Sequence, residues 1–374
     1  MAKIRVLLVD DAAVVRRLVT TALNRDPDLE VVGTAADGRI ALERLDKLQP
    51  DLVLLDLEMP VMSGLETLAV LRKTHPRLPV IMFSRFTQKG VEATVHALTL
   101  GADDYVPKPG DGLDVSCCIE ELLIPKIKLL AKRSISPKCQ RENFPVASAS
   151  GLCAASPTPV QPVPKGTRHR PVQIVVIGTS TGGPNALAEL LPVFPADWNV
   201  PLVVVQHMPP DFTARLAERL NAKSRLRVRE AAAGEPISAA QAWVARGDHH
   251  LLVQQEGNVV CLGLHQGPPV NGCRPAVDVF FHSAAEVYGS GVLAVVLTGM
   301  GQDGLRGCER VRAAGGQILV QDEASSVVWS MPGAVAQAGL ADRVLPLQDL
   351  GQEIIRRVRA SIVKKESKAE HKCP

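Results

Sequence analysis

Short apolar runs recur along this chain, and most of them are followed by a stretch with the periodicity of an amphipathic helix. Because strands that alternate with helices form parallel sheets covered on both faces, this alternation predicts doubly wound α/β domains. In the first part of the chain we expect strands at residues 4–9, 30–33, 51–55, 80–83 and 104–106. Repeats of this spacing predict a flavodoxin-like domain, whose sites lie at the carboxyl ends of the strands.

A second α/β unit is expected beyond a stretch of different composition. Residues 134–170 contain six prolines among Ser, Ala and Thr, which predicts a flexible interdomain linker. After it, the predicted strands are 173–177, 201–205, 292–297 and 317–320, and residues 227–264 are interpreted as inserted hairpins. We therefore expect two doubly wound parallel-sheet domains, flavodoxin-like at 1–133 and Rossmann-like at 171–363, followed by a basic disordered tail at 364–374.

The composition narrows the classes of partner. The 374 residues carry 42 basic and 39 acidic side chains, a formal net charge of +3, so charge gives no reason to expect nucleic acid or an anionic membrane. The eight cysteines form no C-x-x-C pair and no metal-ligand spacing, which favours reduced thiols. No apolar run reaches the ~20 residues of a membrane span, and no signal-peptide pattern opens the sequence. We expect a soluble, cytoplasmic monomer.

Polar side chains stand at the predicted strand ends of the first domain. Asp10 and Asp11 follow the first strand, and Asp56 follows the third. Ser84 and Lys108 follow the fourth and fifth, so all five should meet in one crevice. Each acid alone is consistent with an ordinary loop residue, but the matching positions in chain order favour a site. Because three close carboxylates repel one another and oxygen ligands suit Mg2+, we predict a magnesium site at Asp10, Asp11 and Asp56.

This part of the chain resembles the response-regulator receivers, over roughly residues 3 to 130. The resemblance rests on the DLEMP motif at residues 56–60 and on Lys108-Pro109. It implies that Asp56 is the phosphorylated residue, an established kind of carboxylate nucleophile. It also implies that Ser84, Tyr105 and Lys108 form the receiver switch, with Ser84 as its hydroxyl and Tyr105 as the aromatic that reports phosphorylation.

Further implications of the receiver resemblance concern the phosphodonor and the metal ligands. A histidine kinase would supply the phosphoryl group. A backbone carbonyl near Glu58 would complete the Mg2+ ligands. The Arg85-Phe86 pair departs from the small residues that are common at this point in the family.

A glycine-rich turn follows the first predicted strand of the second domain. The sequence GTSTGGP at 178–184 exposes backbone N–H groups and the Ser180 hydroxyl at the start of a helix. A cofactor phosphate would suit such a turn, but the next strand ends in Gln206-His207 and lacks the acidic ribose ligand of a dinucleotide fingerprint. A structural turn would need the glycines without explaining the G-x-S-x-G form. We interpret Ser180 as a nucleophile and expect no cofactor in this domain.

A serine nucleophile needs a base that is oriented by a third group. His207 lies at the end of the strand predicted beside that of Ser180 and is the candidate base. Asp303, in the second glycine-rich turn at 298–304, is the candidate for orienting it. Thr181 and Met300 are the candidate supports of an oxyanion. The alternative carboxylates are Asp248, Asp278 and Asp322.

The second domain resembles the catalytic domain of the chemotaxis protein-glutamate methylesterases, over about residues 171 to 363. The resemblance rests on the motifs at 178–183, 206–209 and 298–304, in that order. It implies a phosphorylation-activated serine hydrolase that demethylates glutamate 5-methyl esters on methyl-accepting chemoreceptors, releasing methanol. It also implies deamidation of specific receptor glutamines to glutamate, giving sensory adaptation in chemotaxis. The unphosphorylated receiver is expected to cover the active site.

Two other functions remain as alternatives. A non-catalytic regulator would join a receiver to a degenerate α/β module that recruits partners, although the presence of Ser180, His207 and Asp303 together argues against it. A dehydrogenase would bind a cofactor at residues 178–183. Labelling of Ser180 by a fluorophosphonate would distinguish a hydrolase from the regulator.

Overall fold

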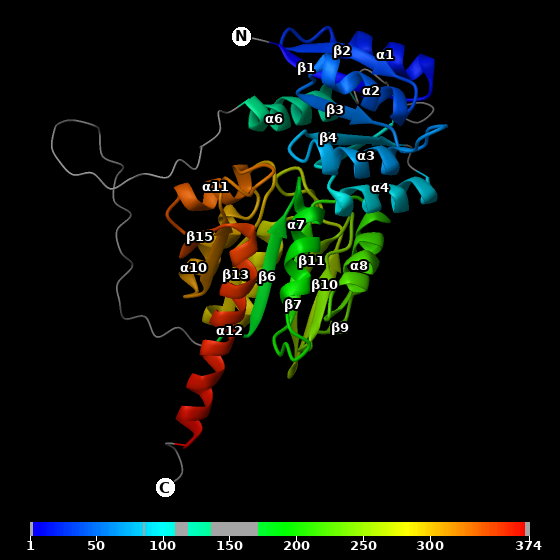
Figure 1. The fold of residues 1–374 in the computed structure, drawn as a ribbon. Helices are drawn as coiled ribbons and strands as arrows, with labels where there is room; N and C mark the ends of the chain where they lie inside the picture. The colour runs from blue at the N-terminus through cyan, green and yellow to red at the C-terminus, as the bar shows by residue number, and fades with distance from the viewer. Residues whose placement is uncertain (1–2, 85–86, 109–118, 136–170, 371–374) are drawn as a thin grey trace, which may run out of the picture.

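Two α/β domains lie one against the other in the computed structural model of the chain, as Figure 1 shows. The structure describes residues 3–84, 87–108, 119–135 and 171–370. The Arg85-Phe86 pair and nearly all of the expected linker therefore fall outside the described residues. Both domains contain a parallel sheet between layers of helices, which confirms the predicted fold class.

A five-stranded parallel sheet forms the N-terminal domain, in the order β2-β1-β3-β4-β5. Its strands are β1 (Ile4–Val9), β2 (Leu29–Ala35), β3 (Leu52–Leu55), β4 (Val80–Ser84) and β5 (Asp104–Pro107). Its described helices are α1 (Ala13–Leu23), α2 (Gly38–Leu48), α3 (Gly64–Thr74), α4 (Gln88–Leu100), the π-helical turn η1 (Ile119–Leu123) and α6 (Ile124–Ile135). This strand order is that of flavodoxin-like domains.

Alternate residues of a buried strand face helices on opposite sides of this sheet. In β1, Val6 and Leu8 pack in a cluster with residues of α1 and α6. Leu7 and Val9 pack in a second cluster with residues of α2, α3 and α4. Successive side chains of a strand point to opposite faces, so a strand covered on both sides needs a continuous apolar run. This requirement explains the sequence pattern from which the strands were predicted.

A seven-stranded sheet forms the C-terminal domain, in the order β15-β14-β13-β6-β7-β10-β8, with parallel pairing throughout. Its strands are β6 (Ile174–Thr179), β7 (Leu202–Gln206), β8 (Arg227–Glu230), β10 (Gln241–Val244), β13 (Val292–Val296), β14 (Gln317–Gln321) and β15 (Arg343–Leu345). Helices α7 (Gly183–Leu190), α8 (Phe212–Lys223) and α12 (Leu347–Glu370) share one apolar cluster. Helices α9 (Val277–Tyr288), α10 (Leu305–Ala313) and α11 (Ser330–Gln337) share the other. The short 3-10 turns are η2 (Leu191–Val193) and η3 (Gly289–Gly291).

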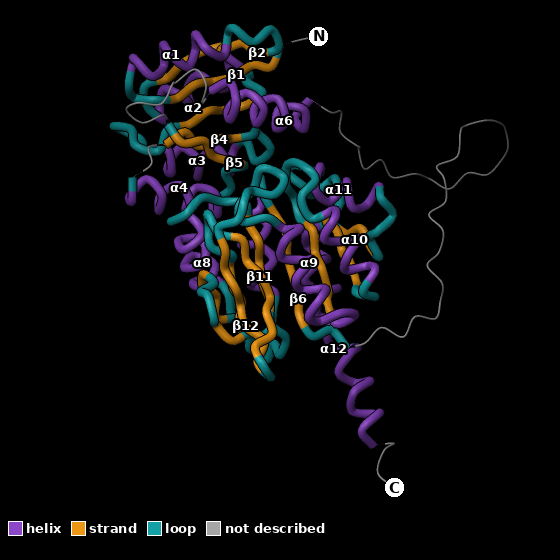
Figure 2. Tube along the Cα trace, turned by 180° about the vertical axis from the view of Figure 1, so that it is seen from behind, coloured by secondary structure: helices purple, strands orange, loops and turns teal. Residues whose placement is uncertain are grey.

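Residues 227–264, expected to be inserted hairpins, divide between two sheets. Strands β11 (His250–Glu256) and β12 (Val259–His265) do form an antiparallel hairpin, to which β9 (Glu235–Pro236) adds, and Figure 2 shows it from behind. The hairpin interpretation is wrong for β8 and β10, which extend the parallel sheet beyond β7. Edge strands such as β8 carry charged residues and lack the apolar run that identifies a central strand.

Helix α12 continues into the segment expected to be a disordered tail. Its backbone is helical through Glu370, so the structure differs from that expectation over residues 364–370. The stretch is rich in Lys, Glu and Ala, whose high helix propensity explains the difference. None of the described helices combines the length and apolar character needed to span a bilayer.

Candidate active site

Neighbouring strands of the large sheet carry the residues predicted to form the hydrolase. Ser180 follows β6, His207 follows β7, and Asp303 lies in the loop between β13 and α10. Strands β7 and β13 flank β6 on opposite sides, so the chain leaves β6 in one direction and later returns to its other side. Such a switch point opens a crevice at the carboxyl ends of the strands, where α/β proteins place their sites.

The loop from β6 to α7 holds Ser180 through its backbone. The Ser180 N–H donates to the Thr298 carbonyl at 3.1 Å, and Gln206 Nε2 donates to the Ser180 carbonyl at 3.0 Å. Gly182, the residue before α7, has a φ of 78°, and a Cβ there would lie 2.5 Å from Val327 Cβ. Only glycine adopts this conformation without strain. The turn therefore requires Gly182 and places Ser180 near the positive end of α7.

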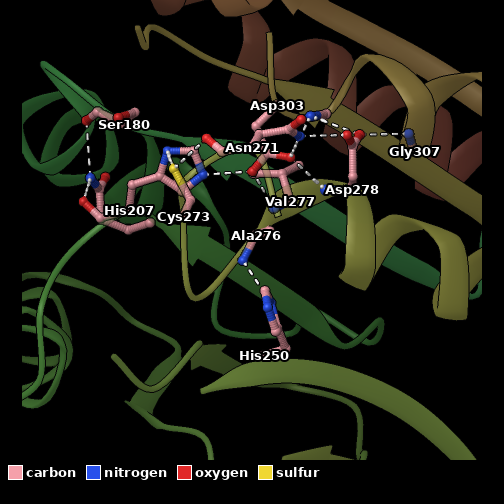
Figure 3. A network of polar contacts seen from close by, with 12 residues as sticks. Ser180, His207, His250, Asn271, Cys273, Ala276, Val277, Asp278, Asp303 and Gly307 are labelled. Atoms are coloured by element: carbon pink, nitrogen blue, oxygen red, sulfur yellow. Dashed lines mark hydrogen bonds and ion pairs between the residues drawn. The ribbon is translucent and has the colours of Figure 1, made fainter. Parts of the chain in front are cut away.

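His207 and Asp303 form a hydrogen-bonded pair, shown in Figure 3. His207 Nε2 lies 2.7 Å from Asp303 Oδ2, and the Asp303 side chain is 1% exposed. Burial disfavours the charged imidazole, but the hydrogen bonds to Asp303 and Cys273 outweigh burial and raise the pKa of His207 to about 9. Burial alone would raise the pKa of Asp303, and the bond from His207 instead lowers it. The contact between the two groups thus favours the charged form of each.

The Asp303 carboxylate also caps a helix. It accepts hydrogen bonds from the N–H groups of Val277 at 2.6 Å and Asp278 at 3.0 Å, where α9 begins. Asp278 in turn accepts from the N–H groups of Gly304 at 2.9 Å and Gly307 at 2.7 Å, where α10 begins. Each carboxylate thus satisfies N–H groups that a helix start leaves without an internal partner. Asp278, an alternative partner of His207, instead holds the start of α10.

The other carboxylates considered as partners of His207 have different contacts. Asp248 accepts from Arg274 Nε at 2.9 Å. Asp322 accepts from the Ser325 N–H at 3.0 Å. Asp303 is therefore the carboxylate that the structure brings to His207.

Backbone donors lie close to Ser180 on two loops. One is the loop from β6 to α7, which contains Ser180. The other is the loop between β13 and α10, which approaches so closely that a Cβ on Gly299 would lie 2.9 Å from Ser180 Cβ. Within the described part of the chain, no hydrogen bond uses the N–H groups of Thr181 or Met300, the predicted oxyanion supports. Thr181 is buried and Met300 is exposed. Two N–H groups thus remain available on loops that meet at the nucleophile.

The Ser180 hydroxyl and His207 are not joined by a hydrogen bond among the described residues. The imidazole uses Nε2 for Asp303, and its Nδ1 lies 3.5 Å from Sγ of Cys273. Cys273 is partly exposed. Proton transfer from Ser180 therefore requires Nδ1 to exchange its thiol partner for the hydroxyl.

A second polar cluster lies at the carboxyl edge of the N-terminal sheet. Lys108 Nζ lies 2.7 Å from Asp10 Oδ2 and 2.6 Å from Asp56 Oδ2, and all three side chains are largely buried. Asp11 is exposed beside them, and carboxylate oxygens of the three aspartates lie within 4.8 Å of one another. Burial raises the pKa of Asp56 to about 6, although Lys108 opposes the shift. The structure thus brings these predicted residues together.

The other two residues of the predicted switch, Ser84 and Tyr105, contact groups outside this cluster. Ser84 ends β4 and is buried, but its hydroxyl lies 2.8 Å from Thr94 Oγ1. The Tyr105 ring stacks on Phe212 of the C-terminal domain, with centroids 4.8 Å apart and planes 17° apart. Burial raises the pKa of the Tyr105 phenol, which stays protonated. Tyr105 therefore lies in the contact between the domains.

The segment that opens β5 closes over the Ser180 loop. Thr181 Oγ1 donates to Asp104 Oδ2 at 2.7 Å, and the Gly182 N–H donates to the Asp103 carbonyl at 3.1 Å. The space left beside Ser180 is a cavity of about 80 Å3 lined by residues of both domains. Small-molecule sites typically measure several hundred Å3. The pocket beside Ser180 is therefore smaller than a typical small-molecule site in this arrangement.

Sequence reasoning missed several residues of this region. Asn271 contacts Asp303, Cys273 contacts His207, and Asp104 contacts Thr181. The Asn-Gly dipeptide at 271–272 is a turn signal, but it does not reveal which distant residue the turn meets. Gln206 belongs to a motif that was recognised, without its role in holding Ser180.

Family comparisons agree with both halves of the site. A model described as "Response regulator receiver domain" matches residues 6–116, and one described as "CheB methylesterase" matches residues 175–354. Fold and site together define a response regulator whose output domain is a serine hydrolase. Relatives from Trichodesmium erythraeum and Nocardioides sp., both named "Protein-glutamate methylesterase/protein-glutamine glutaminase", are each 48% identical over 96% of this chain and cover 100% and 96% of their own lengths. The chain belongs to the CheB methylesterase family, which confirms the resemblance predicted from its motifs.

A solved structure is also similar to the second domain. The crystal structure of the Thermotoga maritima CheB methylesterase catalytic domain is 43% identical in sequence. The match covers 50% of this chain and 98% of the Thermotoga maritima chain, with a TM-score of 0.49.

Proposed function

We propose that this chain hydrolyses glutamate 5-methyl esters on methyl-accepting chemoreceptors, releases methanol, and deamidates specific receptor glutamines to glutamate. The activity is that named for relatives which match the chain over nearly their whole length. The observation that carries the proposal is the 2.7 Å contact of His207 with Asp303, at the strand ends beside Ser180. Ester and amide hydrolysis both transfer a side-chain acyl group to water, so one site serves both.

In the proposed reaction, Ser180 Oγ attacks the side-chain carbonyl carbon while His207 Nδ1 takes the hydroxyl proton. The carbonyl oxygen becomes an oxyanion, which the N–H groups of Thr181 and Met300 stabilise. His207 then gives its proton to the departing methanol or ammonia, leaving an ester between Ser180 and the receptor glutamate. Asp303 holds the imidazolium through Nε2 until that proton leaves.

Water completes the proposed cycle. His207 removes a proton from water as its oxygen attacks the acyl carbon. The second tetrahedral intermediate collapses, the C–O bond to Ser180 breaks, and the serine oxygen takes the proton back from His207. The products are free Ser180 and a receptor glutamate.

Phosphorylation of Asp56 is proposed to open the site. The support is the closed contact, in which Asp104 and Asp103 bind the residues that follow Ser180. Tyr105, a proposed switch residue, stacks on Phe212 within the same contact. A change at Asp56 that moves Ser84 and Tyr105 would weaken this contact. A shift from mostly closed to mostly open requires a few kcal/mol of difference between the states.

The receiver cluster fits a divalent cation. Asp10, Asp11 and Asp56 offer only carboxylate oxygens, within 4.8 Å of one another, and such ligands suit Mg2+. When bound, Mg2+ supplies positive charge that offsets the carboxylates and the incoming phosphoryl group. Lys108, which already contacts Asp56, is proposed to hold a phosphoryl oxygen. No cofactor is proposed for the catalytic domain.

The proposed setting follows from the same activity. A chemotaxis histidine kinase is the phosphodonor, the chain acts in the cytoplasm as a monomer, and nucleic acid is not a partner. The proposed division is a receiver at 1–133, a linker at 134–170 and a catalytic domain at 171–363. The formal net charge of +3 supports the view that nucleic acid is not a target.

Methanol release from methylated chemoreceptor membranes tests the proposal. The assay compares the full chain with Ser180→Ala, each with and without Mg2+ and a small phosphodonor. We expect release by the full chain, an increase with the phosphodonor, and none from Ser180→Ala. A full chain that releases no methanol under any condition would leave the non-catalytic regulator as the better reading.

A further inference from the structure

We propose that Asn271 is a positioning residue for the hydrolysis, which acts through Asp303 to fix the direction of the His207 imidazole. The inference rests on the proposed function, because it assigns a role within the same reaction. Its basis is a single side-chain amide that binds the carboxylates of Asp303 and Asp278 at once.

The contacts of Asn271 account for both hydrogens of its amide nitrogen. Nδ2 donates to Asp303 Oδ1 at 2.9 Å and to Asp278 Oδ2 at 2.8 Å, as Figure 3 shows. A primary amide nitrogen carries two hydrogens, so neither is left over. Asn271 therefore bridges the carboxylate that pairs with His207 and the carboxylate that holds the start of α10.

The two oxygens of Asp303 have different partners. Oδ2 accepts from His207 Nε2 and the Val277 N–H. Oδ1 accepts from the N–H groups of Asp278 and Gly304 and from Asn271. Among the described residues, Asn271 is the one side-chain donor to Oδ1. It therefore holds the oxygen opposite the one that faces the imidazole.

A neutral donor suits this place because two acidic groups lie together. Burial and the nearby Asp303 charge raise the pKa of Asp278, whereas the pKa of Asp303 is lowered. Like charges in a buried setting repel, and a hydrogen bond to the ionised form offsets that cost. The Asn271 amide donates to both groups without adding charge. It thereby helps Asp303 to remain ionised beside His207.

The backbone presents this amide in a fixed direction. Asn271 has a φ of 54°, a left-handed conformation that asparagine tolerates better than most residues. Val270 and Cys273 exchange backbone hydrogen bonds of 3.1 and 2.9 Å across the turn. The next residue, Arg274, donates from Nε to Asp248 at 2.9 Å and from Nη1 to the Gly267 carbonyl at 3.0 Å. The turn is therefore held on both sides of Asn271.

The turn at residues 270–273 contacts both members of the His207–Asp303 pair. Asn271 holds Asp303, and Cys273, two residues later, lies 3.5 Å from His207 Nδ1. Loss of the amide would free the Asp303 carboxylate to rotate, and the imidazole that it orients would follow. A misplacement of about 1 Å can cost about 100-fold in rate.

The experiment compares Asn271→Ala and Asn271→Asp with the unaltered full chain. The matched control is Asn221→Ala, since the Asn221 side chain also takes part in a hydrogen bond, which it accepts from the Val228 N–H outside the proposed site. For each protein we would measure kcat and KM for methanol release, thermal unfolding, and the pKa of His207 by NMR of its imidazole. The titrating groups around His207 are Asp303, Cys273, Asp278 and His250.

We expect Asn271→Ala to lower kcat on its alkaline plateau, where His207 is neutral, by about 10- to 100-fold, with KM changed less than about threefold. The pKa of His207 should fall, because a displaced Asp303 stabilises the imidazolium less. Asn271→Asp keeps the shape of the side chain but replaces the donor with a third carboxylate, so kcat on the alkaline plateau should also fall. Asn221→Ala should keep the kcat and the His207 pKa of the unaltered chain.

Other outcomes overturn the inference. A kcat for Asn271→Asp within about twofold of the unaltered chain would remove the need for the amide donor. A lower unfolding temperature with an unchanged His207 pKa in both variants would reduce Asn271 to a structural residue. If Asn271→Ala does not fold, the kcat and the His207 pKa of Asn271→Asp alone test the inference. Absence of methanol release by the unaltered chain would contradict the proposed function, while the NMR comparison would still test the positioning.

Discussion

The Thr181 hydroxyl donates a 2.7 Å hydrogen bond to Asp104 of the receiver, which ties the residue after Ser180 to the other domain. Lys126 Nζ binds the second oxygen of the same carboxylate at 2.9 Å, so Asp104 is held from both sides. The contact between the domains thus reaches the candidate nucleophile loop itself, and its strength can be measured as a change in basal hydrolysis.

Replacing Asp104 by Ala should raise basal methanol release in the absence of a phosphodonor. A typical hydrogen bond contributes about 1 kcal/mol, so the increase should be about fivefold. Asp28→Ala is the matched control, because Asp28 pairs with Lys128 on the exposed surface of the receiver. An unchanged basal rate in Asp104→Ala, with normal stimulation by the phosphodonor, would show that this contact does not restrain the site.

Hydrolysis by the unphosphorylated chain should increase with pH up to about 9, the pKa to which Asp303 and Cys273 raise His207. Only the neutral imidazole accepts the Ser180 proton, so a raised pKa moves the active form to higher pH. Below that value, kcat/KM should rise about tenfold per pH unit. Parallel assays with Ser180→Ala subtract alkaline hydrolysis of the ester. A plateau that begins at pH 7 would contradict the prediction.

Alkylation of Cys273 should inactivate the hydrolase. Its Sγ lies 3.5 Å from His207 Nδ1, so a carbamidomethyl group would occupy the place that the Ser180 hydroxyl must reach. Iodoacetamide should inactivate the unaltered chain, and Cys273→Ser should resist it. Mass spectrometry identifies the modified residue. Equal inactivation of both proteins would assign the effect to another cysteine.

Mg2+ binding to the receiver should weaken as the pH falls through about 6, the value to which burial raises the pKa of Asp56 in the metal-free site. A protonated carboxyl offers the cation less charge, so the ligand set is weaker below that pH. Calorimetric titration with Mg2+ at pH 5 and pH 7, with Asp56→Asn as the comparison, measures the effect. Removal of Mg2+ by a chelator should abolish incorporation of phosphate from a small donor. Equal Mg2+ affinities at pH 5 and pH 7 would contradict the assigned pKa.

Replacing Asp303 by Ala should damage both the chemistry and the fold. We expect kcat to fall by about 10,000-fold, as when the acid of a serine triad loses its function. Loss of the cap on α9 should cost a further ~1 kcal/mol of unfolding free energy. Asp322→Ala is the control, since Asp322 accepts from the Ser325 N–H outside the candidate site. It should lose stability while keeping kcat.

The catalytic candidates could be predicted because they lie at strand ends. Ser180, His207 and Asp303 each follow an apolar strand within a recognisable motif, and parallel strands bring their carboxyl ends together. Asn271 and Cys273 lie on an irregular segment whose path depends on the Arg274 contact with Asp248. No periodic pattern encodes such a path.

Two other features of the structure could not be predicted from the sequence, for different reasons. The contact of Asp104 with Thr181 joins separate domains, and no sequence pattern pairs two residues that lie 77 positions apart. The parallel pairing of the edge strand β8 was not predicted, because Arg227 and Arg229 interrupt the apolar run that is typical of a buried parallel strand. In both cases, burial depends on neighbours that are distant in the chain.

The small pocket beside Ser180 should also distinguish reagents by their size. Its space of about 80 Å3 is smaller than a fluorophosphonate that carries a bulky fluorophore, so we expect such a probe to react when the domains separate. The labelling rate of such a probe is then proportional to the fraction of molecules that are open at any moment. A series of probes of increasing size would measure the interdomain equilibrium directly, without receptor, kinase or any turnover of substrate.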